Sequence, residues 1–133
     1  QCINYTKADG TAVAAAGGLS VFAGNSTRDM TTAAGAQVIT GVGFQPAGIL
    51  FHCCFDQAGN VAGWGFHDSN GGKSFSTYPT GQFADASGVA LFQDSANYQY
   101  MSSVSFDADG FTINWLKGGS PTGTARIRYW CLA

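Results

Sequence analysis

The residues best suited to nucleophilic chemistry are two histidines, His52 and His67, and the adjacent cysteines Cys53 and Cys54. A histidine beside a cysteine can activate the thiol, so the pairs to consider are Cys54 with His52 and Cys53 with His67. Residues two apart on a strand share a face without having to touch, and the sequence shows no third side chain to orient either histidine. We therefore expect structural roles for all four residues.

Paired carboxylates for glycosidase chemistry could come only from Asp, because all eight acidic residues are Asp. Turn residues account for most of them, since an Asp side chain accepts hydrogen bonds from nearby backbone N–H groups. The Asp residues predicted to lie in turns or loops are Asp9, Asp56, Asp68, Asp85, Asp94, Asp107 and Asp109. The sequence also contains no GxSxG, HExxH or phosphate-loop motif. It therefore predicts a protein that is not an enzyme and has no catalytic residues.

The segment from Asp107 to Gly110 could begin a calcium loop, because Asp-Ala-Asp-Gly supplies carboxylates at alternate positions. A calcium loop of the EF-hand type would end in a bidentate Glu, and the chain has none. The residues that follow, 111–115, alternate as a strand does. We therefore expect a hairpin turn, with no metal ion and no cofactor.

The cysteines are Cys2, Cys53, Cys54 and Cys131, and their spacing is not that of a zinc site. Four cysteines could form two disulfides, and Cys2 and Cys131 near the two ends of the chain could meet. Cysteines on apolar strands are more often buried thiols, which is the interpretation favoured here.

Three tryptophans, Trp64, Trp115 and Trp130, could line a platform on which a sugar stacks. Packing in the core or in a subunit interface is the commoner role of such residues and is expected here. Tyr129 and Trp130 have opposite parity, so one of the two should face away from the core.

The composition describes one domain of 133 residues with few charges. Charged residues make up 11%, against about 25% in typical soluble domains, so we expect neighbouring subunits to cover much of the surface. The alternative is an extracellular protein whose surface is Ser, Thr, Asn and Gly. The net charge is −2 with scattered cations, which argues against nucleic-acid binding. No run of 18 apolar residues predicts a transmembrane helix, and no membrane partner is expected.

The hydrophobic pattern is that of an all-β protein. Apolar residues alternate with period two, and Gly, Asn and Asp clusters separate the runs. Both faces of 49–55 are partly apolar, which is typical of a strand covered on both sides. We predict an antiparallel β-sandwich, jelly-roll-like, of about eight strands. They lie at 38–42, 49–55, 61–67, 73–78, 89–93, 98–106, 111–115 and 125–132.

Residues 1–36 differ from the β-sandwich domain predicted over 37–133. Ala, Gly, Thr and Ser supply 21 of these 36 positions, and the aromatic residues are Tyr5 and Phe22. We expect an N-terminal arm, with loosely packed strands around 3–5 and 19–22, that gains order from a neighbouring subunit. The alternative is a pair of edge strands within the same domain.

Three segments carry a resemblance to a known family. They are ITGVGFQP at 39–46, SFDADGFTINW at 105–115 and ARIRYWCLA at 125–133. Together they resemble small β-sandwich proteins of tailed bacteriophages, which serve as capsid decoration (cement) proteins or as tail and fibre modules. The resemblance covers about residues 37–133.

This resemblance implies a non-enzymatic virion structural protein on the surface of an extracellular particle. Such a protein decorates and stabilises a phage capsid or tail through contacts with the major capsid or tail protein, as a homo-oligomer such as a trimer. The GFxP turn and the aromatic last strand are also similar to H-type lectin domains. The alternative function is therefore a receptor-binding, lectin-like module of a tail fibre that binds a glycan.

Overall fold

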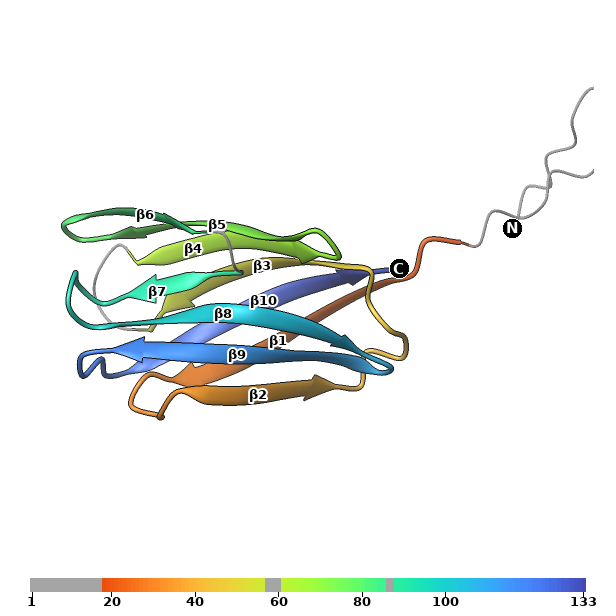
Figure 1. Ribbon diagram of the computed structural model, residues 1–133, viewed down its shortest axis with the longest axis horizontal. Coiled ribbons are helices and arrows are strands. Elements are labelled where there is room, and N and C mark those ends of the chain that lie inside the picture. The colour runs from red at the N-terminus through yellow and green to blue at the C-terminus, as the bar shows by residue number, and fades with distance from the viewer. Residues whose placement is uncertain (1–17, 57–60, 86–87) are drawn as a thin grey trace, which may run out of the picture.

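The protein is all-β and consists of two antiparallel sheets packed face to face (Figure 1). The computed structural model describes residues 18–56, 61–85 and 88–133. Ten strands lie in these residues, and no helix among them is long and apolar enough to cross a membrane. The predicted all-β, antiparallel sandwich is thus confirmed.

The first sheet has six strands, in the order β1 (Val21–Asp29), β10 (Thr124–Leu132), β3 (Gly48–Phe55), β4 (Ala62–Asp68), β5 (Gly71–Tyr78) and β6 (Gly81–Asp85). The second has four, in the order β2 (Gly35–Thr40), β9 (Gly110–Gly118), β8 (Tyr98–Asp107) and β7 (Ala90–Phe92). Every neighbouring pair is antiparallel. The four inner strands of the larger sheet therefore bring the end of the chain beside its middle.

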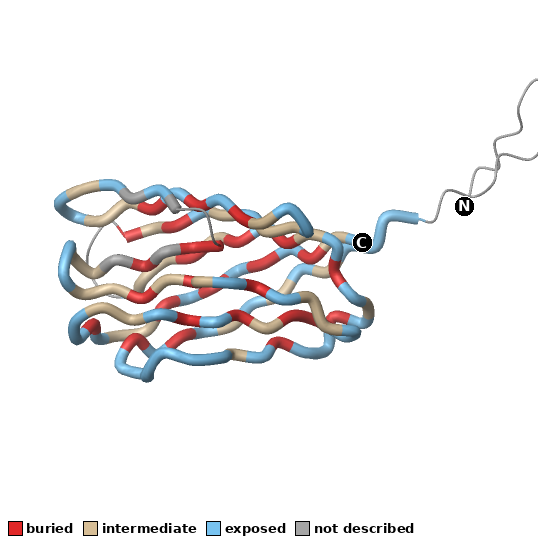
Figure 2. The backbone as a smooth tube through the Cα atoms, viewed as in Figure 1, coloured by how far each residue is buried: buried red, intermediate tan, exposed pale blue. Residues whose placement is uncertain are grey.

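The core lies between the sheets and follows from the alternation along the strands. Figure 2 shows buried and exposed residues alternating along most of them. The Phe111 ring contacts Phe51 and Tyr129 edge to face, with centroids 5.8 and 5.0 Å apart. These contacts join β9 of the smaller sheet to β3 and β10 of the larger one. Burying each such ring stabilises the fold by about 1.5–3 kcal/mol.

Each of the eight strands predicted between residues 38 and 132 overlaps an observed one, but the described residues contain ten strands. Strand β6 was not predicted, because Gly81–Asp85 carries one large apolar residue and therefore shows little alternation. The prediction for 38–42 was displaced, since β2 ends at Thr40 and Val42 lies in the following loop.

The N-terminal part of the described chain contributes one edge strand to each sheet. Strand β1 pairs with β10, and β2 pairs with β9. Phe22 of β1 packs against the core and stacks on Tyr129 with centroids 6.3 Å apart. The strand predicted at residues 3–5 lies outside the described residues.

Candidate functional site

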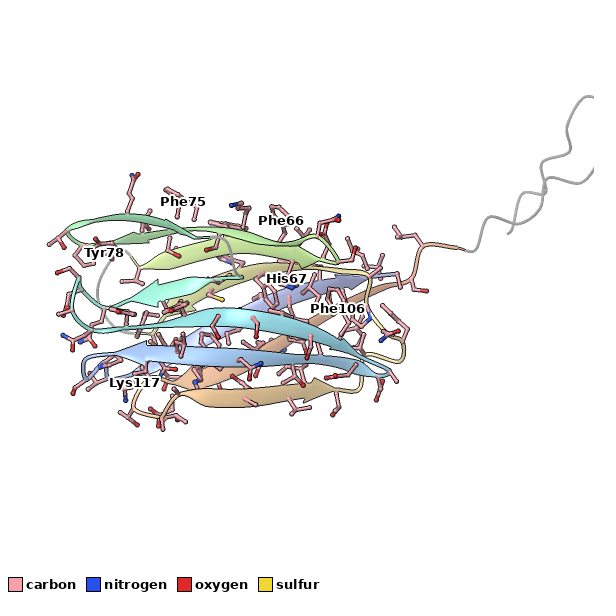
Figure 3. The ribbon with its side chains drawn as sticks, viewed as in Figure 1. Phe66, His67, Phe75, Tyr78, Phe106 and Lys117 are labelled. Atoms are coloured by element: carbon pink, nitrogen blue, oxygen red, sulfur yellow. The ribbon has the colours of Figure 1, made fainter. Side chains whose placement is uncertain are left out.

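Large apolar side chains gather on the outer face of the six-stranded sheet. They come from the four adjacent strands β10, β3, β4 and β5, and between 38% and 57% of each is exposed. We call this set the aromatic face, and its members are Leu50, Trp64, Phe66, Phe75 and Trp130. Figure 3 shows Phe66 and Phe75 projecting away from the smaller sheet, and His67 on the other side of β4, towards Phe106.

The strand register arranges this face in two neighbouring rows. One row contains, in spatial order, Trp130, Leu50, Phe66 and Lys73. The next row contains Arg128, His52, Trp64 and Phe75. Directly opposed residues in a sheet have Cβ atoms about 5 Å apart, so each row is continuous. The face is therefore a product of strand pairing rather than of any one segment.

A groove of about 450 Å³ runs through the aromatic face. The five residues line it together with Phe51, Gly65, Lys73 and Ser74. Its size falls in the range of small-ligand sites, but Lys73 is the only charged side chain among the described residues that line it, and the hydroxyl of Ser74 is buried. The groove therefore favours an apolar occupant.

Trp64 is held in place by His52. The two rings stack with centroids 3.9 Å apart and an angle of 22° between their planes. Trp64 nevertheless keeps 57% of its surface exposed. A large ring that is fixed before binding loses little conformational entropy when a partner covers it.

Two cations flank the aromatic face, Lys73 on β5 and Arg128 on β10. Further along β10, Arg126 forms an ion pair with Asp56. Since both partners are well exposed, this pair contributes little to stability.

The outer face of the four-stranded sheet is different in character. Two of its rows are Val38, Thr112 and Ser105, and Ala36, Asn114 and Ser103. Asn114 Nδ2 donates to Ser103 Oγ at 3.1 Å, and Thr112 Oγ1 donates to Asp107 Oδ2 at 2.7 Å. The large apolar residues exposed on this face lie in separate rows, Val38 opposite Thr112 and Leu116 opposite Tyr100.

The structure does not bring Cys53 and His67 together. The two residues lie on the paired neighbouring strands β3 and β4. Cys53 lies opposite Gly63 and His67 lies opposite Ile49, so they are offset by about 13 Å along the strands. Burial raises the pKa of the Cys53 thiol, with a smaller contribution from Cys54, so the thiol stays protonated. Such a thiol is a poor nucleophile.

The described cysteines Cys53, Cys54 and Cys131 are free thiols, as the sequence favoured. Burial also raises the pKa of Cys131, to about 11. Cys2, and with it the suggested pairing with Cys131, lies outside the described residues.

The hairpin predicted at Asp107–Gly110 is confirmed, since these two residues close the β8–β9 ladder. Gly41 N–H and Gly43 N–H donate to the Asp109 carboxylate at 3.1 and 2.6 Å. The Asp109 carboxylate thus serves to hold a loop. In the part of the chain that the structure describes, no three His, Cys, Asp or Glu side chains form a cluster that could hold a metal ion.

Most other Asp residues also lie at turns. Their carboxylates accept hydrogen bonds from Thr31 (Asp29), Asn70 (Asp68) and Asn97 (Asp94). Asp85, which was also predicted in a turn or loop, is the last residue of β6, just as Asp68 and Asp107 are the last residues of β4 and β8. Asp9 lies outside the described residues.

Core packing is observed for one of the three tryptophans, and the prediction that one of Tyr129 and Trp130 faces away from the core is confirmed. Tyr129 is buried and Trp130 is exposed, and Trp115 lies fully in the core. Trp64 and Trp130 thus belong to the aromatic face. The sequence analysis did not single out Leu50, Phe66 and Phe75. The one sequence signal for the aromatic face was that both faces of the strand at 49–55 are partly apolar.

A buried polar cluster was also missed. Arg28 Nε donates to Gln99 Oε1 at 2.9 Å, and the guanidinium lies 5.3 Å from the centre of the Trp115 ring. Gln99 Nε2 donates to the carbonyl oxygens of Met30 and Thr32. This cluster ties β1 and the loop after it to β8 and β9.

Comparison with known protein families, with curated proteins and with solved structures found no match for this chain. The strongest functional feature of the described chain is its aromatic face, because large apolar side chains from four adjacent strands are exposed together on it.

Proposed function

We propose that this chain is a non-enzymatic structural protein of a tailed-bacteriophage particle. Built as a jelly-roll-like sandwich with an N-terminal arm, it decorates and stabilises a capsid or tail through contacts between subunits. The motifs at 39–46, 105–115 and 125–133 support this proposal through their resemblance to phage sandwich proteins. The observation that carries it is the uncovered aromatic face on a chain with only 11% charged residues.

An apolar face of this size marks an interaction surface, because monomeric proteins seldom expose large contiguous apolar patches. Full burial of a large apolar side chain contributes about 1.5–3 kcal/mol, so covering five half-buried ones contributes roughly 5 kcal/mol. Association itself costs about 4–15 kcal/mol. A stable contact therefore requires the surrounding surface of the sheet as well as the aromatic face.

The test is whether the chain occurs on a particle in stoichiometric copies. Particles carrying the chain are purified, the copy number is measured by mass spectrometry, and density for the sandwich is sought by electron cryomicroscopy. We expect symmetry-matched copies on the capsid or tail. Absence of the chain from purified particles of the phage that encodes it would contradict the proposal.

A glycan-binding module of a tail fibre is the second candidate. The observation in its favour is that Trp64 and Trp130 line an open groove, where a sugar ring could stack. A sugar also needs several hydrogen-bonding groups, and the described lining offers few of them besides the Lys73 ammonium, because the Ser74 hydroxyl is buried. Binding of the isolated chain to a glycan array, abolished by Trp64→Ala, would favour this function over the first.

A further inference from the structure

We propose that the aromatic face binds the same face of a second copy of this chain, about a two-fold axis. This inference rests on the proposed structural function and deepens it by naming the partner of that face. The pairing stacks two six-stranded sheets, so that the two sandwiches form four layers.

The first argument is the size of the face. Six strands about 4.8 Å apart, with lengths of roughly 25 Å, present on the order of 600 Å². A standard interface buries about 800 Å² on each partner, so the outer face of this sheet supplies most of that area. The aromatic face occupies the inner strands β10, β3, β4 and β5, with β1 and β6 at the margins. This is the apolar centre and peripheral rim of a protein interface.

The second argument is that the face contains both a projection and a hollow. Trp64 projects from β4, stacked on His52, and the groove lies beside it. A two-fold interface uses one patch twice, so the patch must be complementary to itself. With the two-fold axis across the strands, the two rows exchange, and each Trp64 lies opposite the second copy's Phe66, which lines the groove. This arrangement removes the largest exposed apolar ring from water twice.

The third argument is the placement of the two cations. Lys73 and Arg128 lie in different rows, on the outermost of the four strands that form the face. A two-fold axis along the strands places Lys73 opposite the second copy's Trp130, and Arg128 opposite its Phe75. An axis across the strands places Arg128 opposite the second copy's Trp130, and Lys73 opposite its Phe75. Both arrangements put each cation over an aromatic ring, an attractive contact, rather than over another cation.

The sequence of β3 agrees with such a cover. Both of its faces are partly apolar, a pattern typical of a strand buried on two sides. In a single copy the core covers Ile49, Phe51 and Cys53, while Leu50 remains exposed. A second sheet on the outer face completes the burial that the pattern indicates.

The experiment measures the oligomeric state of the purified chain. Sedimentation equilibrium is run from about 1 to about 300 µM, with a reductant because Cys54 is a free thiol. The wild type is expected to form dimers, with tryptophan emission shifting to shorter wavelength as Trp64 and Trp130 become covered. Trp64→Ser and Phe75→Ser should each raise the dissociation constant at least about tenfold.

The matched controls carry the same kind of change on the other sheet. Val38→Ser and Leu116→Ser also replace exposed apolar side chains, but on the outer face of the four-stranded sheet. They should leave the dissociation constant within about twofold of the wild type. Thermal unfolding followed by circular dichroism identifies any variant that does not fold. Such a variant is replaced by Phe66→Lys, which changes another exposed residue of the aromatic face.

Three results would overturn the pairing. They are a wild type that stays monomeric throughout, a trimer with no dimer, and equal weakening by the Trp64→Ser and Leu116→Ser substitutions. Particle association by a monomeric chain would contradict the pairing and leave the structural function standing. A chain that forms the dimer but is found on no particle would contradict the structural function and leave the pairing standing.

Discussion

The carboxylate of Asp109 accepts a 2.6 Å hydrogen bond from the backbone N–H of Gly43, and the two residues lie in different loops between strands. Gly43 lies in the loop between β2 and β3, which carries the strand path from one sheet to the other. Asp109 lies in the β8–β9 hairpin. Two motifs that are distant in the sequence, GVGFQP and DADG, thus form one corner of the sandwich, where Gln45 Nε2 also donates to the carbonyl oxygen of Phe106.

Removing the Asp109 carboxylate should loosen this corner. Asp109→Ala leaves the N–H groups of Gly41 and Gly43 without their acceptor, and we expect the free energy of unfolding to fall by about 1–2 kcal/mol. Urea denaturation measures the loss. Asp109→Asn keeps one acceptor oxygen and should lose less, so equal losses in the two variants would contradict the role given to the carboxylate.

Gly110 should not tolerate a side chain. Its φ is +151°, and a Cβ atom there would lie 2.0 Å from the carbonyl oxygen of Ile39. Gly110→Ala is therefore expected to destabilise the protein by more than about 2 kcal/mol, because backbone rather than a movable side chain must shift. Gly48→Ala is the control, since its nearest contact would be an ordinary 3.8 Å. Equal midpoints of urea unfolding for the two variants would argue against this steric account.

The buried pair of Arg28 and Gln99 can be tested by a double-mutant cycle. Gln99→Leu leaves the Arg28 Nε–H without its acceptor in a buried site, and should cost about 2–4 kcal/mol. Replacing both residues, as Arg28→Met with Gln99→Leu, removes the stranded cation and should cost less than the sum of the single changes. Additive losses in urea denaturation would show that the two side chains do not act as a pair.

His67 should make stability depend on pH. Burial lowers the pKa of His67, and Asp68 and a hydrogen bond to Val104 only partly oppose it. The unfolded chain therefore takes up the proton first, so stability is fully present above about pH 6.5 and falls as the pH drops below it.

His67→Gln should flatten that dependence in urea denaturation between about pH 5 and about pH 8. His52→Gln, which replaces a histidine on the outer face of the sheet, is the matched substitution measured alongside it. An unchanged slope in the His67→Gln variant would contradict the assignment.

The sandwich could be predicted from the sequence because apolar and polar residues alternate along its strands. Phe111, Ile113 and Trp115 are buried, and Asp109-Gly110 marks the turn before them. The aromatic face could not be predicted in the same way. Parity places Leu50 on one face of its own strand, but only the observed pairing of β3 with β10 puts Trp130 beside it. The burial of Arg28 likewise depends on Gln99, which lies on the other sheet.

The two outer faces of this sandwich are unlike, and that difference limits how far the proposed pairing can extend. One face carries large rings, while the other is rich in hydroxyl and carboxamide groups. When two copies pair through their rings, both ends of the resulting stack present this second kind of face, on which the exposed Val38 and Leu116 lie in separate rows. The proposed pairing uses both aromatic faces, so a third copy could add only through a different surface.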